Sequence, residues 1–89
     1  MMLEYINEPV SVEGQTTAEG TFRPLTFTWQ GRRYPIESWG RESTDMSKIK
    51  TVHCHLVQTA GGETWELCQD KETAQWTLTR HWAVRSRVV

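Results

Sequence analysis

Apolar and polar residues alternate most regularly in the segment Arg23–Trp39, RPLTFTWQGRRYPIESW. Leu25, Phe27 and Trp29 are apolar and the residues between them are threonines, which is the period of two typical of a strand with one buried face. Gly31 supplies the positive φ that a tight hairpin turn requires. The pattern therefore predicts a β-hairpin with an aromatic face and a basic tip.

Two turn geometries are compatible with this hairpin. If Gly31 is the first turn residue, in a type II′ turn, Trp29 faces Tyr34; if Gly31 is the second, in a type I′ turn, Phe27 faces Tyr34. The same side chains share the apolar face in both cases. Pro35 cannot donate to a strand ladder, so we expect an edge or a bulge at this position.

A second hairpin is expected around the glycine pair Gly61-Gly62. A two-residue turn there places Leu56 opposite Leu67. A slip by one residue would place Leu56 opposite Glu66 and invert every face, so we favour the first register. In the favoured register Cys54 and Cys68 point to opposite faces, and the sequence predicts no disulfide between them.

The next turn, around Lys71-Glu72, places Leu67 opposite Trp76 and Trp65 opposite Leu78. Both turns agree on one apolar face, which indicates a three-stranded antiparallel meander. Its expected members are Val52, Leu56, Trp65, Leu67, Trp76 and Leu78.

The whole pattern predicts an all-β fold, an antiparallel meander of about five to six strands curled into an open barrel or a small two-layer sheet. Residues 1–89 make a single domain of this kind. The further elements expected are a strand over Tyr5–Val12, a loop over Glu13–Phe22, a connection over Gly40–Ser47, and strands over Lys48–Thr59 and Glu63–Asp70.

Composition narrows the function classes. Five tryptophans supply the large apolar side chains that a chain of 89 residues needs for a core. A net charge of −1 gives no general electrostatic attraction to nucleic acids or membranes. No apolar run approaches the roughly 18 residues of a membrane span, and the N-terminal residues lack a signal-peptide pattern. Two cysteines in this context favour reduced thiols and a cytoplasmic location.

Three segments resemble a small uncharacterised bacterial domain family. They are Glu8–Val12 (EPVSV), Arg23–Tyr34 (RPLTFTWQGRRY) and Trp76–Leu78 (WTL), of which the F-x-W-x-G-R-R-Y hairpin is the most specific. The chain departs from the family pattern at Gln30 and Pro35, where a basic residue is expected. Members are sometimes attached to error-prone DNA polymerase-like proteins, so the resemblance implies a link to DNA damage tolerance. It implies no catalytic residues.

One candidate site is a metal site. In the favoured register His53, His55, Cys68 and Asp70 share a face of two adjacent strands, with His55 opposite Cys68. Imidazole and thiolate are good zinc ligands. The alternative is an ordinary polar, solvated outer face, since the spacing matches no known zinc signature.

A second candidate site is a basic surface made of Arg32, Arg33 and Arg41 with Trp39. Arginine beside an aromatic ring suits phosphate contacts and base stacking on a single strand. By strict alternation from Ile36, Trp39 points away from the core. The alternative is a hairpin tip that is basic only because it is exposed.

We expect no enzyme activity and no cofactor. The sequence contains no phosphate-binding loop, GxSxG or HExxH motif. Cys68 and His55 are the residue types of a thiolate nucleophile and its base, but a flat strand face offers no oxyanion-hole donors. The leading hypothesis is a non-catalytic binding or adaptor domain whose partner is a protein or another copy of the chain. The alternatives are a nucleic-acid accessory domain and a metal-binding β domain.

Overall fold

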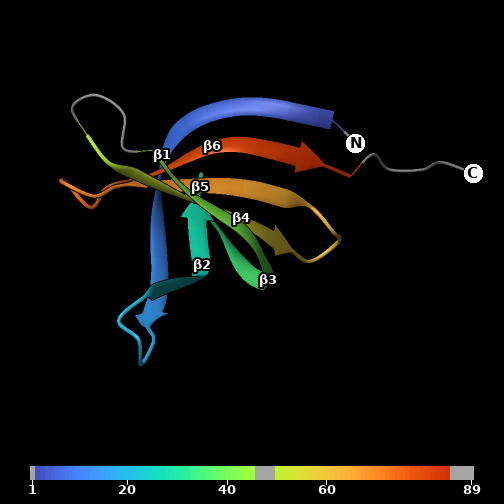
Figure 1. Ribbon diagram of the computed structural model, residues 1–89. Coiled ribbons are helices and arrows are strands. Elements are labelled where there is room, and N and C mark those ends of the chain that lie inside the picture. Colours follow the sequence, from blue (N-terminus) through green and yellow to red (C-terminus); the bar gives the residue numbers. More distant parts are fainter. Residues whose placement is uncertain (1, 46–49, 85–89) are drawn as a thin grey trace, which may run out of the picture.

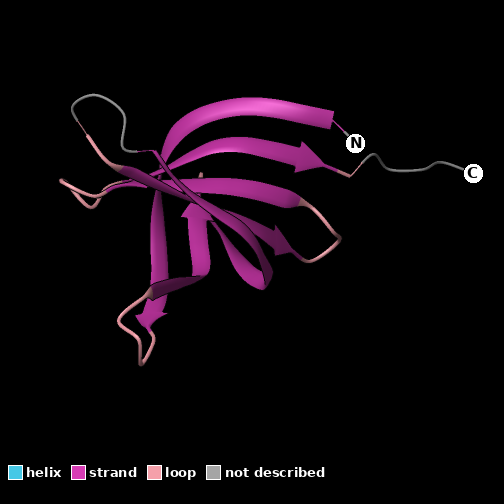
Figure 2. Cartoon of the chain, in the orientation of Figure 1, coloured by secondary structure: helices cyan, strands magenta, loops and turns pink. Residues whose placement is uncertain are grey.

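Six antiparallel strands form a closed ring, and each strand pairs with its neighbour in sequence. The computed structural model describes residues 2–45 and 50–84. These residues include no helix, and so none that could cross a membrane (Figures 1 and 2). The all-β antiparallel meander is confirmed; its closure through β1 and β6 was not predicted. The strands are β1 Met2–Thr16, β2 Phe22–Trp29, β3 Arg32–Asp45, β4 Val52–Thr59, β5 Thr64–Asp70 and β6 Trp76–Ala83.

Two long, bent strands close the ring. The first half of β1 pairs with β6 and its second half, from Ser11, pairs with β2. Likewise, β3 pairs with β2 up to Pro35 and with β4 from Ile36. Figure 1 shows β1 turning sharply away from β6 at this change of partner. The strands thus form two sheets: β1, β2 and β3 make one, and β1, β6, β5, β4 and β3 make the other. Because β1 and β3 belong to both sheets, the two sheets enclose one core.

These two strands are longer than their sequence patterns indicate. β1 extends beyond the predicted Tyr5–Val12 at both ends, and the predicted loop Glu13–Phe22 reduces to the residues between β1 and β2. The predicted connection Gly40–Ser47 is part of β3 as far as Asp45. Polar composition misled the prediction because most of these strand residues are solvent-exposed.

The β2–β3 hairpin has the second of the two predicted turns. Gln30 and Gly31 have φ angles of 52° and 75°, so both central residues are in the positive region of a type I′ turn. Phe27 lies opposite Tyr34, and their rings stack with centroids 4.9 Å apart. The β2–β3 ladder ends at Pro35, which agrees with the break in pairing expected at a proline.

The predicted β4–β5 register is wrong by one residue. The amide of Thr59 donates to the Glu63 carbonyl at 3.0 Å, and the amide of Gly62 donates to the Thr59 carbonyl at 3.2 Å. The turn therefore contains three residues instead of two. Leu56 lies opposite Glu66, and His55 lies opposite Leu67 instead of Cys68. An odd shift inverts the faces, so β4 presents His55 and Val57 to the core.

The predicted β5–β6 register is wrong by two residues, which leaves the faces unchanged. Leu67 lies opposite Leu78 instead of Trp76. A bulge then places Arg80 opposite Glu66, so Thr79 is the additional residue on β6. Beyond the bulge His81 lies opposite Trp65 and becomes a core residue that the alternation did not predict.

Trp65 is the centre of the core. It is 2% exposed, and its ring contacts Phe27, Trp29 and Tyr34 from β2 and β3. The His81 ring stacks on it with centroids 3.7 Å apart, and its indole N–H donates to Thr59 Oγ1 at 2.9 Å. The buried apolar cluster consists of Phe27, Ile36, Val57, Trp65, Leu67, Trp76 and Leu78.

The same register places Cys54 directly opposite Cys68, and the two residues form a disulfide. Their Cα atoms are 4.0 Å apart, and the pair lies on the side of β5 away from Leu67. The prediction of two unpaired thiols is therefore wrong. It failed because the register that separated them was wrong by one residue.

Truncating Trp65 is expected to destabilise the fold far more than truncating Trp39. Trp65→Ala removes a buried ring and a buried hydrogen bond, at a cost of about 3–5 kcal/mol. Trp39 is 37% exposed, so Trp39→Ala should cost about 1–2 kcal/mol. Urea unfolding of both variants checks this, and equal losses would contradict the central position of Trp65.

Candidate functional site

Two bulges in β3 determine which of its side chains face inward. Ile36 lies opposite Thr59, but Trp39 lies opposite Val57 and Glu42 lies opposite His55, because the register shifts after Ile36 and again after Trp39. Each shift inverts the alternation. Trp39 therefore lies on the same side of the sheet as Val57, which strict alternation did not predict. It is nevertheless 37% exposed and lies outside the buried cluster, so the prediction that it is not a core residue is confirmed.

The second bulge brings Glu42 to two histidines of β4. Glu42 Oε1 is 2.8 Å from His53 Nε2 and 3.8 Å from His55 Nδ1. The Thr44 hydroxyl is 2.6 Å from the other ring nitrogen of His53, Nδ1. The two imidazole rings lie edge to face with centroids 4.7 Å apart. Glu42, His53 and His55 are called the β3–β4 triad below.

The environment of the triad favours a carboxylate at Glu42 and a neutral imidazole at His55. The hydrogen bond from His53 is the main cause that lowers the pKa of Glu42 below its ordinary value. Burial is the main cause that lowers the pKa of His55, and it outweighs the opposing attraction of Glu42. Beside the Glu42 carboxylate, His53 Nε2 is the donor of the hydrogen bond, whereas a neutral His55 imidazole keeps one ring nitrogen with a free lone pair.

Two neighbouring cavities open onto the triad. One of about 240 Å³ is lined in part by Glu42 and His55, and one of about 320 Å³ is lined in part by His53 and His55. Both also touch Phe22 at the start of β2. Two cationic side chains, Arg23 and Lys71, border the first and second cavity respectively. The triad is therefore accessible from the space between β2 and β3.

Trp39 bridges the place where β2 and β3 separate. Its indole N–H donates to the Pro24 carbonyl at 2.7 Å. The guanidinium of Arg23 lies over its ring, 4.7 Å from the centroid. This cation–π contact forms one wall of the first cavity.

The structure separates the four predicted metal ligands. His53 and His55 are together in the triad, whereas Cys68 is bonded to Cys54 on the other face of the sheet. Asp70 accepts the backbone amides of the β5–β6 turn and pairs with Lys50 at 3.7 Å. Glu42 was not predicted as a ligand because it lies in Gly40–Ser47, the segment interpreted as a connection. The sequence did contain one signal of the bulge that positions Glu42, because a glycine inside a strand, here Gly40, often marks a bulge.

The predicted basic surface is also divided. Arg33 pairs with Glu13 of β1 at 3.2 Å, and Arg32 is exposed at the hairpin tip. Arg41 lines a different cavity, with Cys54 and Glu66, on the outside of the barrel. Of the four residues only Trp39 lies beside the triad, where its cationic partner is Arg23.

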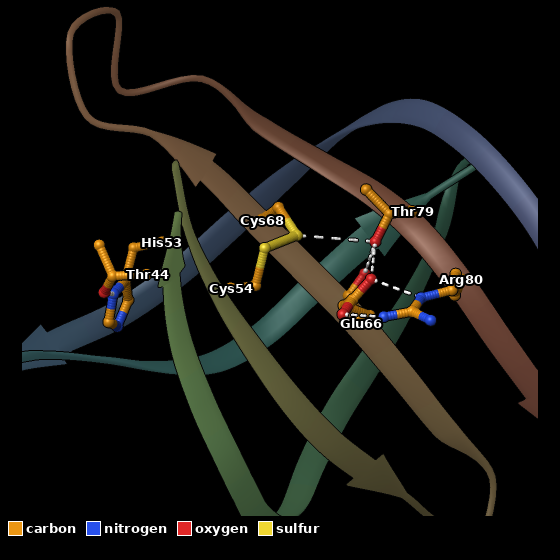
Figure 3. Close-up of a disulfide and its surroundings, with 7 residues drawn as sticks. All are labelled: Thr44, His53, Cys54, Glu66, Cys68, Thr79 and Arg80. Atoms are coloured by element: carbon orange, nitrogen blue, oxygen red, sulfur yellow. Dashed lines mark hydrogen bonds and ion pairs between the residues drawn. A yellow bond between two sulfur atoms is a disulfide. The ribbon is translucent and has the colours of Figure 1, made fainter. Parts of the chain in front are cut away.

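A second polar cluster lies beside the disulfide, where Thr79 Oγ1 is 3.6 Å from Cys68 Sγ (Figure 3). Glu66 accepts two hydrogen bonds from Arg80, at 2.8 and 2.7 Å, and one from the Thr79 hydroxyl at 2.6 Å. The bulge at Thr79 places these donors side by side on β6. Arg80 is the main cause that lowers the pKa of Glu66. The cluster is fully paired and joins β5 to β6.

Exposed apolar side chains gather at the start of β1 and the end of β6. Leu3 lies opposite Trp82, and Tyr5 lies opposite Arg80, whose guanidinium is 5.2 Å from the Trp82 ring centroid. Tyr5 is 71% exposed and Leu3 42%. Met2 and Val84, at the same end of the barrel, are also about half exposed. These residues form the β1–β6 surface.

Comparison with known proteins found no family model, no curated protein and no solved structure that matches this chain. The resemblance of the F-x-W-x-G-R-R-Y hairpin to a bacterial domain family therefore stays a prediction.

Acid should weaken the Glu66 cluster. A carboxyl whose folded pKa lies below its unfolded value stabilises the fold above that value, and this stabilisation is lost as the pH falls through the folded pKa. Glu66→Gln should therefore cost about 1–2 kcal/mol at pH 7, since Arg80 is partly exposed, and much less near pH 3. Urea midpoints of both proteins at the two pH values test this; a pH-independent difference would contradict it.

Proposed function

We propose that this protein is a non-catalytic binding or adaptor domain, and that its first partner is a second copy of the chain, joined through β1. The observation that carries the proposal is the β1–β6 surface. Large apolar side chains are common on a protein surface, but a contiguous group of them marks a contact site. Here Leu3 and Tyr5, on one face of β1, and Val84, just beyond β6, are each more than two-fifths exposed, while Met2 is exposed on the other face of β1.

The backbone of β1 supports the same proposal. Its segment Met2–Tyr5 pairs with β6 along one edge, and no other described strand pairs with that segment. An open edge offers unpaired N–H and C=O groups to an additional strand. Pairing with β2 begins only at Ser11.

A second copy is the favoured partner because Leu3 and Tyr5 lie on one face of this edge, where identical residues of another copy can pack against them. The charge of Glu4, which points inward, is neutralised within the chain by its pairing with His81 at 3.0 Å. The bulge between Tyr5 and Glu8 limits the open edge to the short segment Met2–Tyr5. Two identical edges related by a twofold axis can pair antiparallel, with Leu3 and Tyr5 beside their equivalents.

The proposal predicts concentration-dependent dimers. Because the surface is small, we expect dissociation in the micromolar range. Light scattering after size exclusion should give twice the monomer mass of 10.4 kDa at high concentration. The double variant Leu3→Lys/Tyr5→Lys should be monomeric. The control variant Gln15→Lys, in the half of β1 that pairs with β2, should dimerise like the wild type.

Circular dichroism verifies that both variants are folded. A wild-type chain that remains monomeric at several hundred micromolar would refute self-association, and so would a double variant that dimerises like the wild type.

A nucleic-acid accessory domain is the second candidate. It is supported by Arg23 over the Trp39 ring, a pairing of cation and aromatic side chain that also serves base stacking. Against it, Arg33 is partly neutralised by Glu13. Binding of single-stranded oligonucleotides that weakens steeply with salt would favour this candidate over self-association.

A cytoplasmic location remains part of the proposal. Reducing compartments keep most cysteine pairs as thiols. In the cytosol Cys54 and Cys68 would therefore be joined only under oxidising conditions, and dimerisation through β1 does not require them.

A further inference from the structure

We propose that the β3–β4 triad binds a divalent transition-metal ion, with zinc as the ion that its donor set fits best. The ligand atoms of Glu42, His53 and His55 all lie within 4.8 Å of one another. This site is independent of the β1–β6 surface and goes beyond the function proposed above.

The donor set selects the class of metal. Two imidazole nitrogens and one carboxylate oxygen suit zinc, copper or nickel, whereas calcium and magnesium prefer oxygen ligands alone. Three protein ligands leave a fourth tetrahedral position free. The two cavities that meet at the triad leave room there for water or a small anion. Lys71 in the second cavity would favour an anion, whereas in the first cavity Glu19 lies with Arg23.

The surrounding residues orient the ligands. A histidine ligand is normally fixed by a hydrogen bond at its other ring nitrogen. His53 has this arrangement, because Thr44 binds Nδ1 while Nε2 faces Glu42. His55 is held by the core, where its ring lies 5.6 Å from that of Trp76. Each histidine therefore presents a nitrogen toward the carboxylate without rearrangement of the backbone.

The two distances measured at Glu42 require only a small movement of its carboxylate, and all three ligand atoms lie within 4.8 Å of one another. Ligand atoms about 2.1 Å from a tetrahedral ion are about 3.4 Å apart. Glu42 Oε1 is at present 2.8 Å from His53 Nε2 and 3.8 Å from His55 Nδ1. The Glu42 side chain is 49% exposed and free to rotate by the necessary few tenths of an ångström.

Zinc titration of the EDTA-treated, dialysed protein at pH 7.5, followed by calorimetry, tests the proposal. We expect one zinc ion per chain with micromolar or tighter affinity. Glu42→Gln and His53→Gln should each weaken it at least tenfold, and Thr44→Val, which removes only the orienting hydroxyl, about tenfold. His55 is left unchanged because it is buried.

Two controls exclude other sites. Glu37→Gln, an exposed carboxylate on the same strand, should bind zinc like the wild type. A Cys54→Ser/Cys68→Ser variant should do the same, which excludes a site made of those thiolates with Glu66. The proposal is overturned if the wild type binds no stoichiometric zinc, if the triad variants bind it equally well, or if the cysteine variant loses it. The triad would then be a polar cluster only.

Discussion

The three-residue turn between β4 and β5 is the constraint on which the rest of the structure depends. Thr59 pairs with Glu63 through its amide, and this pairing decides which alternate residues of β4 point inward. Thr59 itself is then buried and accepts the hydrogen bond of the Trp65 indole. Val57 fills the core beside it, and His55 follows on the same side. The core and the triad are therefore set by the length of one loop.

Bulges make the second contribution, because they place polar groups where strict alternation would not. The two bulges of β3 turn Trp39 and Glu42 toward the same side, so that Glu42 reaches His55. The bulge of β6 turns His81 onto Trp65 and leaves Arg80 outside with Glu66. An additional residue costs one position of the ladder but redirects every side chain that follows it.

Turn lengths and bulges therefore decide which parts of the structure could be predicted from the sequence. The alternation of Phe27 and Trp29 and the apolar pattern of β5 predicted the aromatic hairpin and the inward side of β5 correctly. From Leu67 to Gln69 the β5–β6 register was wrong by two residues, and the inward side of Trp76 and Leu78 was still predicted because an even shift preserves the faces. Across the bulge the error at Trp65 is three residues, so His81 was missed as a core residue.

The β4–β5 register was wrong by one residue, and that error inverted β4. This error affected the predicted metal site most. Of its four predicted ligands, His53 and His55 do lie together, but their third partner is Glu42 instead of Cys68 or Asp70. Composition alone cannot distinguish a two-residue glycine turn from the three-residue turn that begins at Ala60.

The pairing of Cys54 with Cys68 tests the β4–β5 register most directly, because the alternative register puts the two thiols on opposite faces. The measurement is the intact mass of the purified protein after mild oxidation with oxidised glutathione and alkylation under denaturing conditions. The register predicts a monomeric chain that has lost both thiol hydrogens and carries no alkyl group. Two alkylated cysteines, or disulfides that form only between chains, would contradict it.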